Sequence, residues 1–189
     1  HHALLWAGTA SSVVNLHPEG FSESELGAGG MSDGKQAGRG SGPQTGGQYH
    51  ALLWFGTPES VVDLHPSGFD WSVAEGVSGN QQVGWGSGPG GWHALLWSGR
   101  ADTVVDLNPA GFTESEARAV SQRRQVGYGK APSTGGQPHA LLWSGTADSV
   151  IDLHPSGFTL SVADGIWGND QVGMGWGPGT GGKEHALLW

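Results

Sequence analysis

Two sets of histidines recur along the chain, and they are the residues best suited to metal or acid–base chemistry. The first set opens each copy of the pentapeptide His-Ala-Leu-Leu-Trp, and the second follows an Asp-Leu or Asn-Leu pair. The members are His2, His50, His93, His139 and His185, and then His17, His65 and His154. A ring of imidazoles could bind a metal ion. However, neither set has the spacing of a helical zinc motif, and Asn108 replaces the histidine in one copy. We expect structural hydrogen bonds here, with no metal site and no cofactor.

A set of acidic residues precedes each Leu-His-Pro or Leu-Asn-Pro turn. It consists of Asp63, Asp106 and Asp152, with Asn15 at the same place in the first copy. Side chains of this type cap turns, whereas a calcium loop needs several closely spaced oxygen ligands that are absent here. The chain has no G-x-S-x-G nucleophile motif, and no pair of carboxylates stands apart from the rest. We therefore predict that the protein is not an enzyme.

Aromatic residues at non-repeated positions are the best candidates for ligand recognition. The variable residue of the repeated Gln-x-Gly-x-Gly segment is Arg39, Trp85, Tyr128 or Met174, and further tryptophans occur outside the repeated framework. Exposed rings beside Gly-rich loops suit a sugar, because a pyranose face stacks on a ring while polar groups hold its hydroxyls. We take Trp85, Tyr128 and Trp176 as candidate ligand-binding residues. The alternative is that these rings pack between structural units.

Internal repetition is the dominant feature of the sequence. The His-Ala-Leu-Leu-Trp segment begins at positions 2, 50, 93, 139 and 185, and each of the first four copies is followed by the same two further segments. The repeat units are residues 2–49, 50–92, 93–138 and 139–184, with a fifth partial copy at 185–189. A period of this length indicates a propeller or a related repeat array, so we treat residues 1–189 as one repeat domain.

Each unit contains the pattern of about four short strands. Ala-Leu-Leu-Trp is a short apolar run typical of a strand covered on both faces. The β-branched segment after it ends at a proline, and the last segment is a hairpin around a turn such as Gly79-Asn80. The sequence therefore predicts an all-β fold, a β-propeller of four four-stranded blades. The tryptophans expected between the blades are Trp6, Trp54, Trp97, Trp143 and Trp189.

Composition excludes several classes of partner. The chain has 8 basic and 17 acidic residues and a formal charge of −9, so it lacks the basic surface that nucleic acid or an anionic membrane requires. No apolar run is long enough to insert into a membrane, and there is no cysteine for a disulfide or thiolate site. The 36 glycines and 10 tryptophans indicate short strands with tight turns rather than a disordered chain.

The three repeated segments together resemble the HAF repeats of bacterial extracellular proteins. The resemblance rests on His2–Trp6 and its copies, on the Asp-Leu pairs, and on the hairpin of residues 79–84. It implies a propeller-like protein located outside the cell or on its surface, and it supplies no catalytic residues. We expect a non-catalytic scaffold or binding module that associates with itself through strand exchange. The alternative is a multivalent lectin with glycans as partners. In a closed ring one terminal His-Ala-Leu-Leu-Trp copy is surplus: it either replaces the other or begins a further repeat.

Overall fold

The computed structural model describes residues 1–189 and contains short β-strands and single 3₁₀ turns, with no α-helix. The strands are β1 (Leu4–Leu5), β2 (Val14–Asn15), β3 (Glu23–Ser32), β4 (Lys35–Ser41), β5 (His50–Trp54), β6 (Val62–Asp63), β7 (Trp71–Ser78), β8 (Gln81–Gly88), β9 (Gly91–Trp97), β10 (Val105–Asp106), β11 (Glu114–Ser121), β12 (Arg124–Lys130), β13 (His139–Trp143), β14 (Ile151–Asp152), β15 (Leu160–Trp167), β16 (Asp170–Trp176) and β17 (His185–Leu188). The 3₁₀ turns are η1 (Ala10–Ser12), η2 (Pro43–Thr45), η3 (Pro58–Ser60), η4 (Ala101–Thr103), η5 (Pro132–Thr134), η6 (Ala147–Ser149) and η7 (Pro178–Thr180). The prediction of an all-β fold is confirmed.

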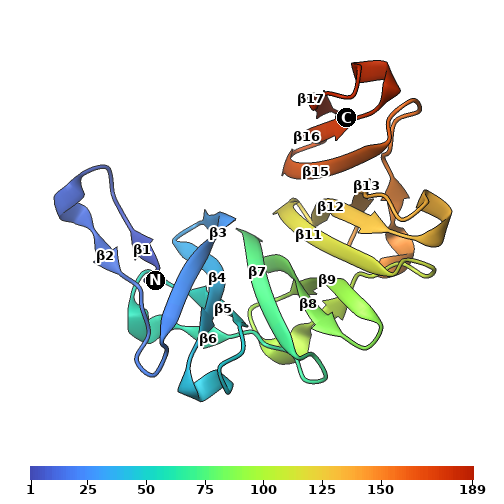
Figure 1. Ribbon diagram of the computed structural model, residues 1–189. Helices are drawn as coiled ribbons and strands as arrows, with labels where there is room; N and C mark the ends of the chain where they lie inside the picture. Colours follow the sequence, from blue (N-terminus) through green and yellow to red (C-terminus); the bar gives the residue numbers. More distant parts are fainter.

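The strands form antiparallel sheets that stand one after another along an arc (Figure 1). Three sheets have four strands in chain order, β3 to β6, β7 to β10 and β11 to β14, while β1–β2 and β15–β17 form smaller sheets. A single parallel bridge between Gly29 and Gly76 joins the first two four-stranded sheets through β3 and β7. The first strand of each sheet lies on the inner side of the arc (Figure 1). These strands therefore form one shared concave surface.

The arc is open, and the closed ring of four blades expected from the sequence is not formed. The N-terminal strands, in blue, and the C-terminal strands, in red, lie at opposite ends of the arc (Figure 1). Each sheet packs against the next through its first strand and a wedge of side chains. Together, the rotations between successive sheets add up to less than a full circle.

The sheets are out of phase with the sequence repeats. The His-Ala-Leu-Leu-Trp segment forms the third strand of a sheet, as in β5, β9, β13 and β17, and it pairs with a hairpin from the preceding repeat unit. The fifth copy is therefore the third strand of the last sheet, on β16, with the register of β13 on β12. It is not a surplus strand. Each sheet combines the end of one repeat unit with the beginning of the next, which ties neighbouring units together.

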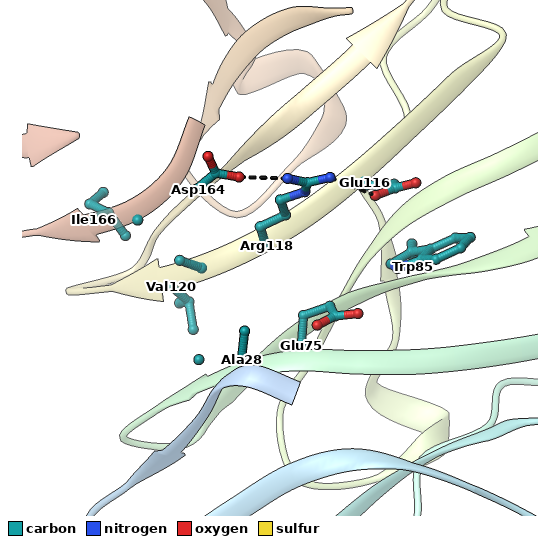
Figure 2. Close-up of a pocket in the computed structure, with 11 residues that line it drawn as sticks. Ala28, Glu75, Trp85, Glu116, Arg118, Val120, Asp164 and Ile166 are labelled. Atoms are coloured by element: carbon teal, nitrogen blue, oxygen red, sulfur yellow. Dashed lines mark hydrogen bonds and ion pairs between the residues drawn. The ribbon is translucent and has the colours of Figure 1, made fainter. Parts of the chain in front are cut away.

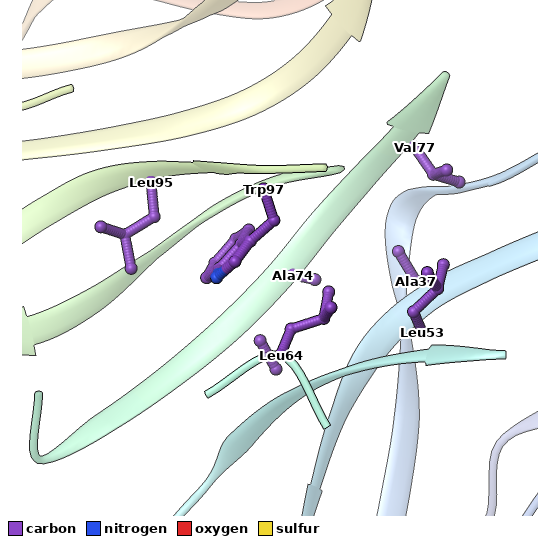
Figure 3. Close-up of a cluster of buried hydrophobic side chains, with 8 residues drawn as sticks. Ala37, Leu53, Leu64, Ala74, Val77, Leu95 and Trp97 are labelled. Atoms are coloured by element: carbon purple, nitrogen blue, oxygen red, sulfur yellow. The ribbon is translucent and has the colours of Figure 1, made fainter. Parts of the chain in front are cut away.

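The apolar cores lie between neighbouring sheets. Trp97 is fully buried and packs with Leu95, Leu53 and Leu64 between the first two four-stranded sheets (Figure 3). Trp54 and Trp143 occupy the equivalent positions in the neighbouring wedges and are also fully buried. The two terminal copies differ, because Trp189 is half-buried and Trp6 is 54% exposed. Trp6 has no sheet beside it on its outer side.

One glycine in the second strand of each sheet is required by a close approach of two backbones. A Cβ atom at Gly84 would overlap the carbonyl oxygen of Val73 on the paired strand, and Gly127 stands in the same relation to Glu116. Each lies beside a register shift in the first strand, between Ala74 and Gly76 for Gly84 and between Ala117 and Ala119 for Gly127. The repeated glycines thus let the bulged inner strand approach its neighbour.

Candidate ligand-binding cleft on the inner face

The repeated histidines and aspartates hold turns together, as expected from the sequence. In the second repeat unit, the His50 imidazole Nδ1 lies 2.7 Å from Oδ2 of Asp63. The other carboxylate oxygen accepts a hydrogen bond from the backbone N–H of His65 at 2.8 Å. The two imidazole rings stack with their centroids 3.9 Å apart. The two hydrogen bonds to the carboxylate recur at Asp106 and Asp152. The imidazole stack recurs between His139 and His154, whereas Asn108 takes the place of the second ring beside Asp106.

The second histidine set binds the first strand of the sheet. His65 Nδ1 lies 2.9 Å from the hydroxyl of Ser72. In the third copy Asn108 makes the same connection, accepting a hydrogen bond from Ser115 at 2.7 Å. Burial lowers the pKa of His65, and of His17 and His154, below the ordinary imidazole value. No group of three or more histidine, aspartate or glutamate side chains in the structure could hold a metal ion.

The three candidate ligand-binding aromatics occupy different environments. Trp85 is half-buried and lines a cleft on the inner side of the arc. Tyr128 is only 9% exposed, and the Arg118 guanidinium lies over its ring at 5.0 Å. Trp176 is half-buried at the end of β16, where it pairs with Leu160, and does not line this cleft. The structure therefore does not bring the three residues into one site.

Trp85 belongs to a cluster of three tryptophans on one sheet. Its ring meets Trp71 of β7 at 4.7 Å in an edge-to-face arrangement, and Trp92 of β9 lies 5.3 Å from it. Trp92 is 40% exposed. In the preceding sheet, the position of Trp85 is taken by Arg39, which is paired with Glu25 at 2.6 Å and stacked on Tyr49. The same part of each wedge thus carries a different set of side chains.

The inner cleft has a volume of about 600 Å³ and crosses the first strands of four successive sheets. Its polar residues are Glu75 of β7, Glu116 and Arg118 of β11, and Asp164 of β15 (Figure 2). Figure 2 shows the Trp85 ring at one end of the cleft, with the Glu75 and Glu116 carboxylates between this ring and Arg118. Ala28, Val120 and Ile166 lie toward the other end of the cleft. This volume is in the range of small-molecule binding sites.

The charges in the cleft are unevenly paired. Arg118 Nη1 is 2.5 Å from Oδ1 of Asp164, which links the last two sheets, whereas its Nη2 is 3.7 Å from Oε2 of Glu116. Glu75 takes part in no salt bridge and is half-buried. Burial raises the pKa of the Glu116 carboxyl; the Tyr128 hydroxyl and Arg118 oppose this shift, and the Glu75 charge adds to it. Three carboxyl groups and one guanidinium leave the cleft with an acidic balance.

Sequence reasoning identified Trp85 but missed the polar residues of the cleft. Glu75, Arg118 and Asp164 occupy the same position in three repeat units: each is the fifth residue of its strand, β7, β11 or β15. Within these otherwise similar segments, this position changes both charge and size. Trp85 was found because its position in the second strand differs between repeats. The same comparison along the first strand would have identified Glu75, Arg118 and Asp164.

Comparison with known proteins identifies no relative of this chain. No protein-family model matches the chain, and neither the curated proteins nor the solved structures contain a significant match. None of the 3₁₀ turns approaches the length and hydropathy of a helix that could cross a membrane.

Proposed function

We propose that this chain is a non-catalytic repeat scaffold that presents one binding site, the inner cleft. The observation that carries the proposal is that the repeated side chains and the variable side chains have different roles. The repeated histidines, aspartates and serines bond to one another and to backbone groups within the sheets. The residues that differ between repeats, among them Glu75, Trp85 and Arg118, converge on a single cleft. A repeat array that is uniform in its framework and variable at one concave surface is suited to recognition.

The architecture we propose is that of a propeller-type ring of which these sheets form a sector. The support is the sheet itself: four short antiparallel strands in chain order, the first on the inner side, with tryptophan wedges between neighbours. Sheets of this kind add one after another with the same joint. An extracellular or cell-surface location remains a proposal that rests on the resemblance to HAF repeats.

The proposal of a non-catalytic role rests on how the reactive side chains are used. His50, His93 and His139 each bond an aspartate, and His65 and His154 each bond a serine. Side chains committed to such bonds are poorly placed to transfer protons to a substrate. None of these histidines lines the inner cleft.

A fragment screen followed by NMR of the whole chain tests the binding proposal without presuming a ligand class. We expect weak binders whose chemical-shift changes concentrate on the indole N–H of Trp85 and the backbone of residues 116–120. An absence of binders at these resonances, in a screen that finds binders elsewhere on the chain, would contradict the proposal.

Association between copies is a second candidate function. The specific observation is that each His-Ala-Leu-Leu-Trp strand pairs with a hairpin from the preceding repeat unit, as β13 does with β12 and β17 with β16. The same pairing between units of two copies would join the chains, because the units are nearly identical. Leu188 on β17 is 73% exposed. Light scattering coupled to gel filtration should give a mass above the 19.5 kDa of the monomer. The variant Leu188→Lys should restore the monomer, and a monomeric parent chain would exclude this function.

A further inference from the structure

The inner cleft offers carboxylate oxygens that the protein itself leaves partly unused. Glu75 is in no salt bridge. The Glu116 carboxyl has the Tyr128 hydroxyl as a neighbour, and the nearest guanidinium nitrogen lies 3.7 Å from it, beyond hydrogen-bond distance. Glu116 is nonetheless only 8% exposed. The one strong donor in the cleft, Arg118, is already bonded to Asp164 and stacked on Tyr128. A ligand that complements the cleft therefore has to supply donors.

An aromatic surface stands beside these acceptors. Trp85 lines the cleft, and its ring lies at 83° to the Trp71 ring and 5.3 Å from the Trp92 ring. A ring that is fixed by its neighbours loses little conformational freedom when a ligand stacks on it. A pyranose ring has hydroxyl groups and a flat C–H face. The carboxylates would accept hydrogen bonds from the hydroxyls, and the indole would stack on the C–H face.

The charge of the cleft limits the kind of sugar. Glu75, Glu116 and Asp164 face a single guanidinium, and the whole chain carries a formal charge of −9. An acidic saccharide would bring like charges together in a partly buried site, which is unfavourable. Neutral saccharides have hydroxyl donors without this cost.

We propose that the inner cleft binds a neutral pyranose saccharide, with Trp85 as the stacking surface and Glu75 and Glu116 as acceptors of sugar hydroxyl groups. This inference rests on the proposed function, because it names the ligand class of the same cleft. It places one site on the whole arc rather than several equivalent sites, since the aromatic residues of the other sheets are either buried or outside the cleft.

Calorimetric titration of the complete chain tests the inference. The ligands are soluble gluco-, manno-, galacto- and chito-oligosaccharides, with an oligogalacturonate as the acidic member. We expect at least one neutral series to bind, and the acidic series to bind at least tenfold more weakly. Trp85→Ala and Glu75→Gln should each weaken binding at least tenfold. Glu75→Gln keeps the shape of the side chain, so it remains informative if the tryptophan variant is unstable.

Trp167→Ala is the matched control, because Trp167 is 84% exposed on β15 and does not line the cleft. It should bind the saccharide as the parent chain does, and an equal loss in this variant would overturn the assignment. If no saccharide binds while screened fragments still shift the cleft resonances, the sugar inference fails and the binding scaffold stands. If tetraethylammonium binds the cleft and no saccharide does, the site is selective for cations and the inference is again overturned. Failure of both the fragments and the sugars would remove the proposed function as well.

Discussion

The backbone N–H of Ala51, in the third strand of one sheet, donates a hydrogen bond to the hydroxyl oxygen of Ser72, in the first strand of the next sheet, at 3.0 Å. The same bond joins Ala3 to Ser24, Ala94 to Ser115 and Ala140 to Ser161. This bond is present at all four joints between successive sheets. The hydroxyl also meets the histidine or asparagine of the preceding turn, so the loop and two sheets share one oxygen atom.

The serine joint should contribute measurably to stability. Ser72→Ala leaves the buried Ala51 N–H without an acceptor, and an unsatisfied buried group costs about 1–3 kcal/mol. We expect the free energy of unfolding in urea, followed by circular dichroism, to fall by an amount in this range. Ser87→Ala on the neighbouring strand is the control, since the Ser87 side chain makes no hydrogen bond within the chain. Equal stabilities for the two variants would show that the joint does not depend on the hydroxyl.

The half-buried histidines of the second set predict a loss of stability in acid. Burial, reinforced by the neighbouring imidazole, lowers the pKa of His17, His65 and His154 in the folded chain. The unfolded chain therefore binds protons more readily below about pH 6.5, and folding stability decreases as the pH falls through that value. The urea midpoint should be lower at pH 5.0 than at pH 7.5.

Asparagine at these three positions should remove part of this pH dependence. Asn108 already fills the site in the third copy, where it donates to the Phe112 carbonyl at 3.2 Å and accepts from Ser115. The triple variant His17→Asn, His65→Asn, His154→Asn is therefore expected to fold, with a smaller difference between the midpoints at the two pH values. His185→Asn, at an exposed position, should behave as the parent chain. An unchanged difference in the triple variant would exclude these histidines as its source.

The strands were predictable from sequence because their signals are local. The apolar Ala-Leu-Leu-Trp run and the Gly79-Asn80 turn each specify a strand or a turn within a few residues, and the structure has β7 end at Ser78 and β8 begin at Gln81. Closure was not predictable, since it depends on the angle between sheets. That angle is determined by contacts such as the bridge of Gly29 with Gly76, which are 47 residues apart in sequence. The cleft was missed for a similar reason: Glu75 and Asp164 line one cleft only because the two joints between their sheets curve in the same direction.

The close backbone approach at Gly84 gives a sharp test of the bulged inner strand. An added methyl group in Gly84→Ala would overlap the Val73 carbonyl oxygen, so the paired strands must separate. Overpacking of this kind costs about 1–3 kcal/mol, and hydrogen exchange should become faster in β7 and β8. Gly179→Ala is the control, because its added methyl group would make only an ordinary contact, 3.6 Å from the Gly157 carbonyl oxygen. If Gly84→Ala is as stable as Gly179→Ala, the glycine is not needed at the joint.

The repeated tryptophans should differ in their contribution although their sequence contexts are nearly identical. Trp97 is fully buried between two sheets and contacts the leucines of both, whereas Trp6 is 54% exposed. Replacing a fully buried tryptophan by alanine costs about 3–5 kcal/mol through lost burial and the cavity left behind. Trp97→Ala should therefore lower the urea midpoint strongly, and Trp6→Ala should change it little. In a repeat array each sheet is stabilised mainly by its immediate neighbours, so hydrogen exchange in Trp97→Ala should become faster first in β5 to β10. Uniformly faster exchange across β11 to β16 as well would mean that the arc unfolds as one cooperative unit and not joint by joint.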